Sequence, residues 1–140
     1  MESKTYTTIG DTASSTHEFV TSVEGLSDIV LSHGPHGSPF HHVVIAFNSS
    51  LENSIFKSAS LRSIHLNSVK VENDAVLASV PGKTVRRLTN MDLKIVIKSD
   101  GEMTKETAEE MLKEAMEQDL IVKLAKKSGL KIQHEIEVSY

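Results

Sequence analysis

The chain has 140 residues, of which 39% are apolar and 24% charged, and a formal net charge of −4. This length fits one domain over residues 1–140, and the ordinary composition excludes disordered and fibrous proteins. Nineteen carboxylates against 15 Lys and Arg argue against a nucleic-acid-binding protein. Because the sequence contains no cysteine, disulfides, thiolate nucleophiles and sulfur-ligated zinc are excluded.

No sequence feature directs the chain to a membrane. Every apolar run falls well short of the roughly 20 residues that span a bilayer. The first residues also lack the basic flank and apolar stretch of a secretory signal. We therefore expect a cytoplasmic protein with no membrane partner.

The first third of the chain predicts extended structure. Residues 17–23 alternate apolar and polar side chains, residues 26–32 are short and β-branched, and Glu24–Gly25 between them is typical of a hairpin turn. A loop over residues 33–38 follows, with two glycines, a proline and two histidines.

A long helix is predicted next. Ser38 can cap its free amides, and Pro39 at the first helical position loses no hydrogen bond. Apolar residues then recur at spacings of three and four up to about residue 62, namely Phe40, Val44, Phe47, Leu51, Ile55 and Ala59. Small or polar residues flank this stripe, which indicates a central helix packed on more than one side.

The remaining segments predict strands and a second helix. Residues 66–72 and 92–98 are strand-like, with a short strand around 76–80 before a Pro81–Gly82 turn. One helix is expected from near Thr104 to a stop at Gly129, followed by an alternating strand over 131–139. The order indicates an α+β fold with an antiparallel sheet.

Two segments carry a resemblance to a known family. The stretch 38–50 (SPFHHVVIAFNSS) and the stretch 64–71 (IHLNSVKV) resemble the OsmC/Ohr family of osmotically inducible and organic hydroperoxide resistance proteins. Members carry a Ser/Thr/Asn-Pro helix start, an apolar stretch ending in small residues and a cysteine, and then an I-x-L-x-x-V-x-V strand. The tail also resembles the family, because 119–123 looks like its second cysteine turn. The likeness begins near residue 17.

The resemblance implies an OsmC-like fold in an entwined homodimer and thiol-dependent reduction of organic hydroperoxides. The family's two cysteine positions correspond here to Ser50 and Asp119, and Phe40 stands where peroxidase members have a glutamate after the proline. A hydroxyl cannot form the sulfenic acid that this chemistry requires. We therefore expect a member without thiol peroxidase activity, to which a stress-response role attaches only by resemblance.

The predicted site is a pocket at the dimer interface that holds a small hydrophobic or anionic molecule, with no cofactor required. A glycine-rich loop before a capped helix presents free amides to a carboxylate or to the phosphate of a cofactor. The candidate binding residues are His33, His36, Gly37, Ser38, His41 and Ser50. Asp119 is expected to be a turn or cap residue.

Three alternatives stay open. His33, His36, His41 and His42 could hold a divalent metal, although no carboxylate or cysteine ligand lies nearby in the sequence, so no metal site is predicted. An enzyme of non-thiol chemistry could use His33, His36 or His41 with Ser50. On one helix, however, His41 and Ser50 lie about 13 Å apart at ~1.5 Å per residue. The third alternative is a purely structural dimer.

Overall fold

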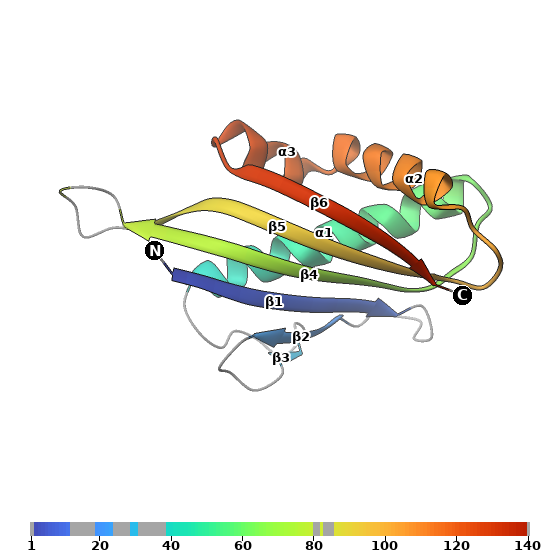
Figure 1. Cartoon of the computed structure of the whole chain (residues 1–140), viewed down its shortest axis with the longest axis horizontal. Helices are drawn as coiled ribbons and strands as arrows, with labels where there is room; N and C mark the ends of the chain where they lie inside the picture. The colour runs from blue at the N-terminus through green and yellow to red at the C-terminus, as the bar shows by residue number, and fades with distance from the viewer. Residues whose placement is uncertain are drawn as a thin grey trace.

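The computed structural model describes the backbone of residues 2–11, 19–23, 29–30, 39–79, 82 and 86–139, and side chains over residues 42–78, 82 and 87–139. Figure 1 shows its elements in chain order. The strands are β1 (Glu2–Asp11), β2 (Phe19–Val23), β3 (Ile29–Val30), β4 (Leu66–Ser79), β5 (Arg86–Ser99) and β6 (Lys131–Ser139). The helices are α1 (Pro39–Leu61), α2 (Lys105–Gln118) and α3 (Leu120–Lys127).

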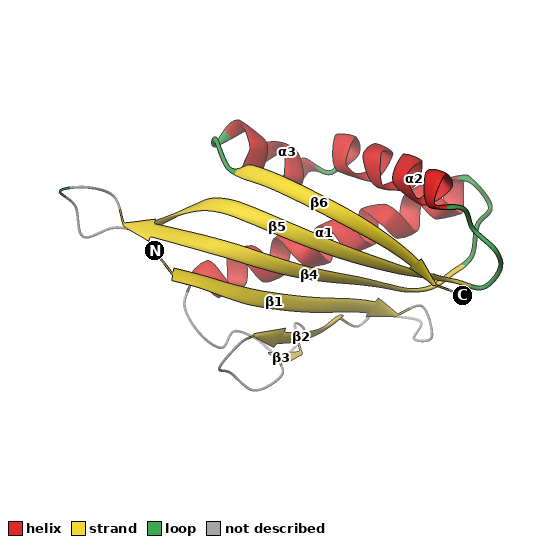
Figure 2. Ribbon diagram, in the orientation of Figure 1, coloured by secondary structure: helices red, strands yellow, loops and turns green. Residues whose placement is uncertain are grey.

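The described strands form one sheet in the order β3-β2-β1-β4-β5-β6, with the helices packed against it (Figure 2). Neighbouring strands are antiparallel except at one edge, where β6 runs parallel to β5. The prediction of an α+β fold is therefore confirmed, but the sheet is mixed rather than antiparallel. Parallel neighbours require a crossover connection, and α2 and α3 supply it between β5 and β6.

Strand β1 is the element that the sequence did not predict. Its residues, ESKTYTTIGD, contain one isoleucine and no apolar alternation. The strand nevertheless lies inside the sheet, because its backbone pairs with β2 on one side and with β4 on the other. The β-branched threonines and the tyrosine fit such a position, since a central strand is held by its ladder as well as by buried side chains. The predicted hairpin of β2 and β3 is confirmed by their pairing, while its turn lies outside the described residues.

The core lies between α1, α2 and the face of the sheet formed by alternate residues of β4 and β5. On α1 the predicted stripe is buried from Val44 through Phe47, Leu51 and Ile55 to Ala59, each at most 1% exposed. Facing it, the odd-numbered residues are buried over 69–77 of β4 and 91–99 of β5, for example Val71 and Ile95, which pair across the ladder. Asn48, Ser49 and Ser58 of α1 are buried too. The expectation that α1 packs on more than one side is thus confirmed.

Two further predictions are wrong in detail. The separate short strand expected near residues 76–80 is part of β4, which runs without interruption from Leu66 to Ser79. The single second helix is two helices, since α2 ends and α3 begins at Asp119. The extended backbone of Asp119 (φ −76°, ψ 118°) breaks the helical path. Its amide still donates to the Ala115 carbonyl, so it closes α2 while opening α3.

Candidate functional site

Ser50 and Asp119, the two positions that the resemblance aligns with cysteines, lie in direct contact. Ser50 is on α1 and Asp119 lies 69 positions later, between α2 and α3. The Ser50 hydroxyl donates to the Asp119 carboxylate, with Oγ 2.8 Å from Oδ2 and 3.0 Å from Oδ1. The packing of α1 against the α2–α3 junction therefore brings these two side chains together.

Asp119 is a buried carboxylate whose partners all come from the protein. Its side chain is almost fully buried, with 3% of the residue exposed. Besides Ser50, Ser54 Oγ donates to Oδ2 at 2.7 Å and the Val122 amide donates to Oδ1 at 3.1 Å. The bond to Val122 makes Asp119 the N-cap of α3, which confirms its expected role as a cap. Several donors offset the cost of removing the charge from water.

The chemistry open to this pair is hydrogen bonding rather than nucleophilic attack. A serine nucleophile needs a general base within reach that is free to take its proton. Here the Ser50 proton points to a carboxylate that already accepts from Ser54 and Val122. The described contacts of Ser50 include no imidazole. The pair is therefore a buried hydrogen-bonded contact in which donors of the protein itself surround the carboxylate.

An apolar cavity of about 280 Å³ lies between α1, β5 and α3, and neither Ser50 nor Asp119 is among the described residues that line it. It is lined by side chains of α1, β5 and α3, among them Val43, Phe47, Leu88, Met91, Ile121 and Leu124. Along the chain, Phe47 precedes Ser50 by about one helical turn and Ile121 follows Asp119 by two positions, so the cavity shares α1 and α3 with the pair but does not include it. Three large apolar residues at the rim stay exposed: Val43 by 52%, Ile121 by 39% and Leu124 by 55%. A contiguous exposed apolar surface of this kind is typical of a binding site.

The predicted anion site falls largely beyond what the structure describes. His33, His36, Gly37 and Ser38 lie outside the described residues, and His41 is on the first turns of α1 with its side chain likewise outside them. Binding of an anion there, and any role of these histidines, stays a prediction. Over the part of the chain that the structure describes, no three His, Asp or Glu side chains gather as metal ligands. Within the same part, no helix is long and apolar enough to cross a membrane.

Several residues of the site are absent from the sequence-based prediction. Ser54 lies one turn after Ser50 on the same side of α1, so helical spacing alone is enough to add it. Ile121 and Leu124 share a spacing of three in α3, but the sequence predicts one helix from near Thr104 to Gly129 and so does not separate their face from that of α2. Their exposure depends on how α3 is turned against α1, which local sequence does not contain.

A second buried carboxyl, that of Glu52, lies on the sheet side of α1. The residue is fully buried (0% exposed), and neither carboxyl oxygen has a hydrogen-bond partner among the described groups. Burial raises the pKa of Glu52 to about 9. The nearby backbone of Val71 lowers the pKa by a smaller amount, without completing a hydrogen bond. Nearby, Asn73 Nδ2 of β4 donates to Asn48 Oδ1 at 2.9 Å. At neutral pH Glu52 is therefore an uncharged acid in a polar part of the core.

Comparison with solved structures identifies the fold. Similar chains are an OsmC-like protein from Mycoplasma pneumoniae (12% identity over 94% of this chain and 96% of that one, TM-score 0.66) and an OsmC-like hydroperoxide resistance protein from Jannaschia sp. CCS1 (10% over 90% and 88%, TM-score 0.66). An organic hydroperoxide resistance protein OsmC from Legionella pneumophila is 18% identical over 96% of each chain, with a TM-score of 0.57. No protein-family model and no curated protein matches the sequence.

These likenesses cover nearly the whole length of each chain at low identity, so they concern the arrangement of elements rather than particular residues. They agree with the fold that the resemblance of segments 38–50 and 64–71 implied. The chain therefore has the fold of the OsmC-like and organic hydroperoxide resistance proteins.

Proposed function

We propose that this OsmC-like protein has no thiol peroxidase chemistry and binds a small, largely hydrophobic molecule in the apolar cavity between α1, β5 and α3, in a homodimer. The observation that carries the proposal is the cavity itself, with its apolar lining and its exposed apolar rim residues. An apolar body would fill the cavity, and a hydroxyl or similar polar group would contact Ser128, which also lines it.

The lining of the cavity favours a neutral ligand over an anion, because the described residues that line it include no charged side chain. A carboxylate or phosphate would lose its water there without meeting a positive charge. The anionic ligand expected from the loop over residues 33–38 would need the donors of that loop instead.

Two of the three structural neighbours described above are named for hydroperoxide resistance. An organic hydroperoxide has an apolar body and a polar end, which is the shape that this cavity would accept. Reduction of a hydroperoxide by a cysteine protein needs a thiolate that becomes a sulfenic acid. Because the sequence contains no cysteine, we propose that binding persists without this reaction.

The first test is native mass spectrometry of protein purified without added ligand. The proposal expects a dimer that carries a reproducible extra mass, which extraction into organic solvent then identifies. An extra mass equal to a divalent metal would instead support the histidine alternative. An empty dimer would leave the structural alternative, and a monomer would contradict the dimer.

A pair of variants tests the cavity directly with the neutral dye Nile red. Leu124 and Leu120 both lie on α3 and are 55% and 66% exposed, but only Leu124 lines the cavity. Leu124→Gln should weaken dye binding about tenfold, or ~1.4 kcal/mol, while Leu120→Gln should leave it unchanged. Equal affinities of the two variants would contradict the proposed site.

A further inference from the structure

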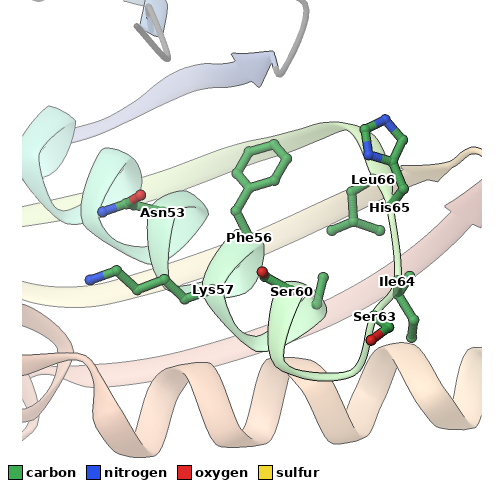
Figure 3. A pocket seen from close by; sticks show the side chains of 9 residues that line it. Asn53, Phe56, Lys57, Ser60, Ser63, Ile64, His65 and Leu66 are labelled. Carbon is green, nitrogen blue, oxygen red and sulfur yellow. The ribbon is translucent and has the colours of Figure 1, made fainter. Parts of the chain in front are cut away.

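A second cavity, of about 530 Å³, lies near the C-terminal end of α1. It is framed by the last turns of the helix and by the segment that returns from α1 to β4 (Figure 3). Asn53, Lys57 and Ser60 contribute from the helix, and Ser63 and His65 from the returning segment. Its volume is within the range of small-molecule sites, about 300–1,000 Å³. None of its lining residues belongs to the apolar cavity described above.

The shape of this cavity follows from the way α1 ends. The Ile64 amide donates to the Ala59 carbonyl at 2.9 Å and the Ser63 amide donates to the Ser60 carbonyl at 3.0 Å. These two bonds form a Schellman cap, in which the residue after the helix takes a left-handed conformation that favours glycine. Here that residue is Ser63, at φ 57°. A hydroxyl-bearing side chain thus lines the cavity at a position where glycine would be more relaxed.

Among the described residues that line this cavity, the charged side chain is that of Lys57, which is positive. Lys57 and His65 are both exposed, and the described residues that line the cavity include no carboxylate. The nearby Arg62 is occupied elsewhere, since its Nη1 lies 3.1 Å from Glu114 Oε1 and donates to Ser58 Oγ at 2.7 Å. No ion pair joins Lys57 to a described carboxylate. The negative partial charge at the C-terminal end of α1 is also reduced there, because backbone amides donate hydrogen bonds to the last carbonyls.

One wall of the cavity is apolar. The half-buried side chains of Phe56 and Ile64 line it together with the buried Leu66. In Figure 3 the ring of Phe56 and the imidazole of His65 extend in the same direction from two sides of the cavity. A flat ligand body can lie against such rings, while its charged group reaches the ammonium of Lys57.

We infer that this second cavity is a binding site for a small organic anion with a flat apolar body. Lys57 supplies the charge, the hydroxyls of Ser60 and Ser63 and the amide of Asn53 supply hydrogen bonds, and Phe56 supplies the apolar contact. The inference is independent of the proposed function, because the two cavities share no lining residue.

The test is a titration of the ¹⁵N-labelled full chain with 2-naphthoate, followed by amide chemical shifts, with 2-naphthalenemethanol as its neutral counterpart. Shifts should cluster over residues 53–66, and the alcohol should bind at least about fivefold more weakly than the carboxylate. Raising the salt concentration should weaken naphthoate binding. Shifts confined to residues 43–47 and 121–130 would place the ligand in the apolar cavity and overturn the inference, as would equal affinities for acid and alcohol.

Two lysine variants separate a local charge from the net charge of the protein. Lys57→Gln should weaken naphthoate binding about tenfold. Lys113→Gln removes the same charge from an exposed position of α2 that does not line the cavity, and it should leave binding unchanged. Equal losses in the two variants would show that only overall charge matters and would overturn the site.

Ser63→Gly provides a test in which stability and binding move in opposite directions. Glycine relaxes the left-handed residue, so the melting temperature should rise. The lost hydroxyl should weaken naphthoate binding about threefold. If the melting temperature rises without any loss of naphthoate binding, Ser63 does not contact the ligand. If Lys57→Gln no longer weakens naphthoate binding in the Ser63→Gly variant, the inference is overturned.

Discussion

Two buried carboxyls, that of Glu52 on α1 and that of Asp119 at the α2–α3 junction, have opposite hydrogen-bonding environments. Asp119, 3% exposed, accepts hydrogen bonds from Ser50, Ser54 and the Val122 amide, whereas fully buried Glu52 has no hydrogen bond from a described group to either oxygen. A carboxylate with several donors can stay charged and stabilise the fold, while one without donors is better accommodated as the neutral acid. The comparison shows that burial alone does not determine what a carboxyl contributes; its donors do.

The largest effect expected from this contrast is a pH dependence that comes from Glu52. Its pKa is about 9 in the folded protein against an ordinary value of 4.5, so at neutral pH the folded state holds a proton that the unfolded state has lost. Stability should therefore fall as pH rises through this window, by about 1.4 kcal/mol per unit and ~3 kcal/mol between about pH 5.5 and 8. Urea unfolding across this range measures it.

Glu52→Gln keeps the shape of the side chain and removes its proton equilibrium. The free energy of unfolding of this variant should lack the decline with pH that the unmodified chain shows, so the two curves should diverge above about pH 6. Parallel curves would mean that Glu52 keeps an ordinary pKa and has a donor or solvent in the folded protein.

Removal of the Asp119 carboxylate should have the next largest effect. Asp119→Ala takes away the N-cap of α3 and leaves the Val122 amide and two serine hydroxyls without their acceptor. The expected loss is about 2–3 kcal/mol of unfolding free energy. Asp119→Asn retains one acceptor oxygen and should lose less. If both variants were as stable as the unmodified chain, the hydrogen bonds of the pair would have no structural role.

An exposed cap provides a milder counterpart. Thr104 caps α2 by accepting from the Thr107 amide at 3.1 Å, in contact with solvent. Thr104→Ala should cost about 1 kcal/mol, because water can replace the lost acceptor. Thermal unfolding of this variant beside Asp119→Ala measures how much burial adds to the value of a cap. A loss as large as that of Asp119→Ala would mean that burial adds nothing to the value of the cap.

The smallest change is expected from Ser50→Ala. Asp119 keeps Ser54 and Val122 as donors, so stability should change by less than about 1 kcal/mol. Binding of Nile red should persist, whereas any turnover that depended on the Ser50 hydroxyl would disappear. Retained dye binding together with lost turnover would favour the enzyme alternative over the binding protein that we propose.

Local sequence was sufficient for α1, β6 and the cap at Asp119. The apolar stripe from Val44 to Ala59 and the alternation over 131–139 are signals of period 3.6 and 2, which local geometry alone produces. The strand-and-helix order with the segments 38–50 and 64–71 also led to the OsmC-like fold. The absence of cysteine excludes thiol chemistry on composition alone, whatever the arrangement of the elements.

Tertiary structure decided what no local pattern contains. The place of β1 in the sheet comes from backbone pairing on both sides, which its largely polar sequence does not predict. Ser50 and Asp119 lie 69 positions apart in the sequence, and their contact depends on how α1 packs against the α2–α3 junction. Whether Glu52 has donors, and whether Lys57 faces a cavity, depends in the same way on groups from other elements. Spacing along the chain specifies faces of helices and strands, but only packing specifies what each face meets.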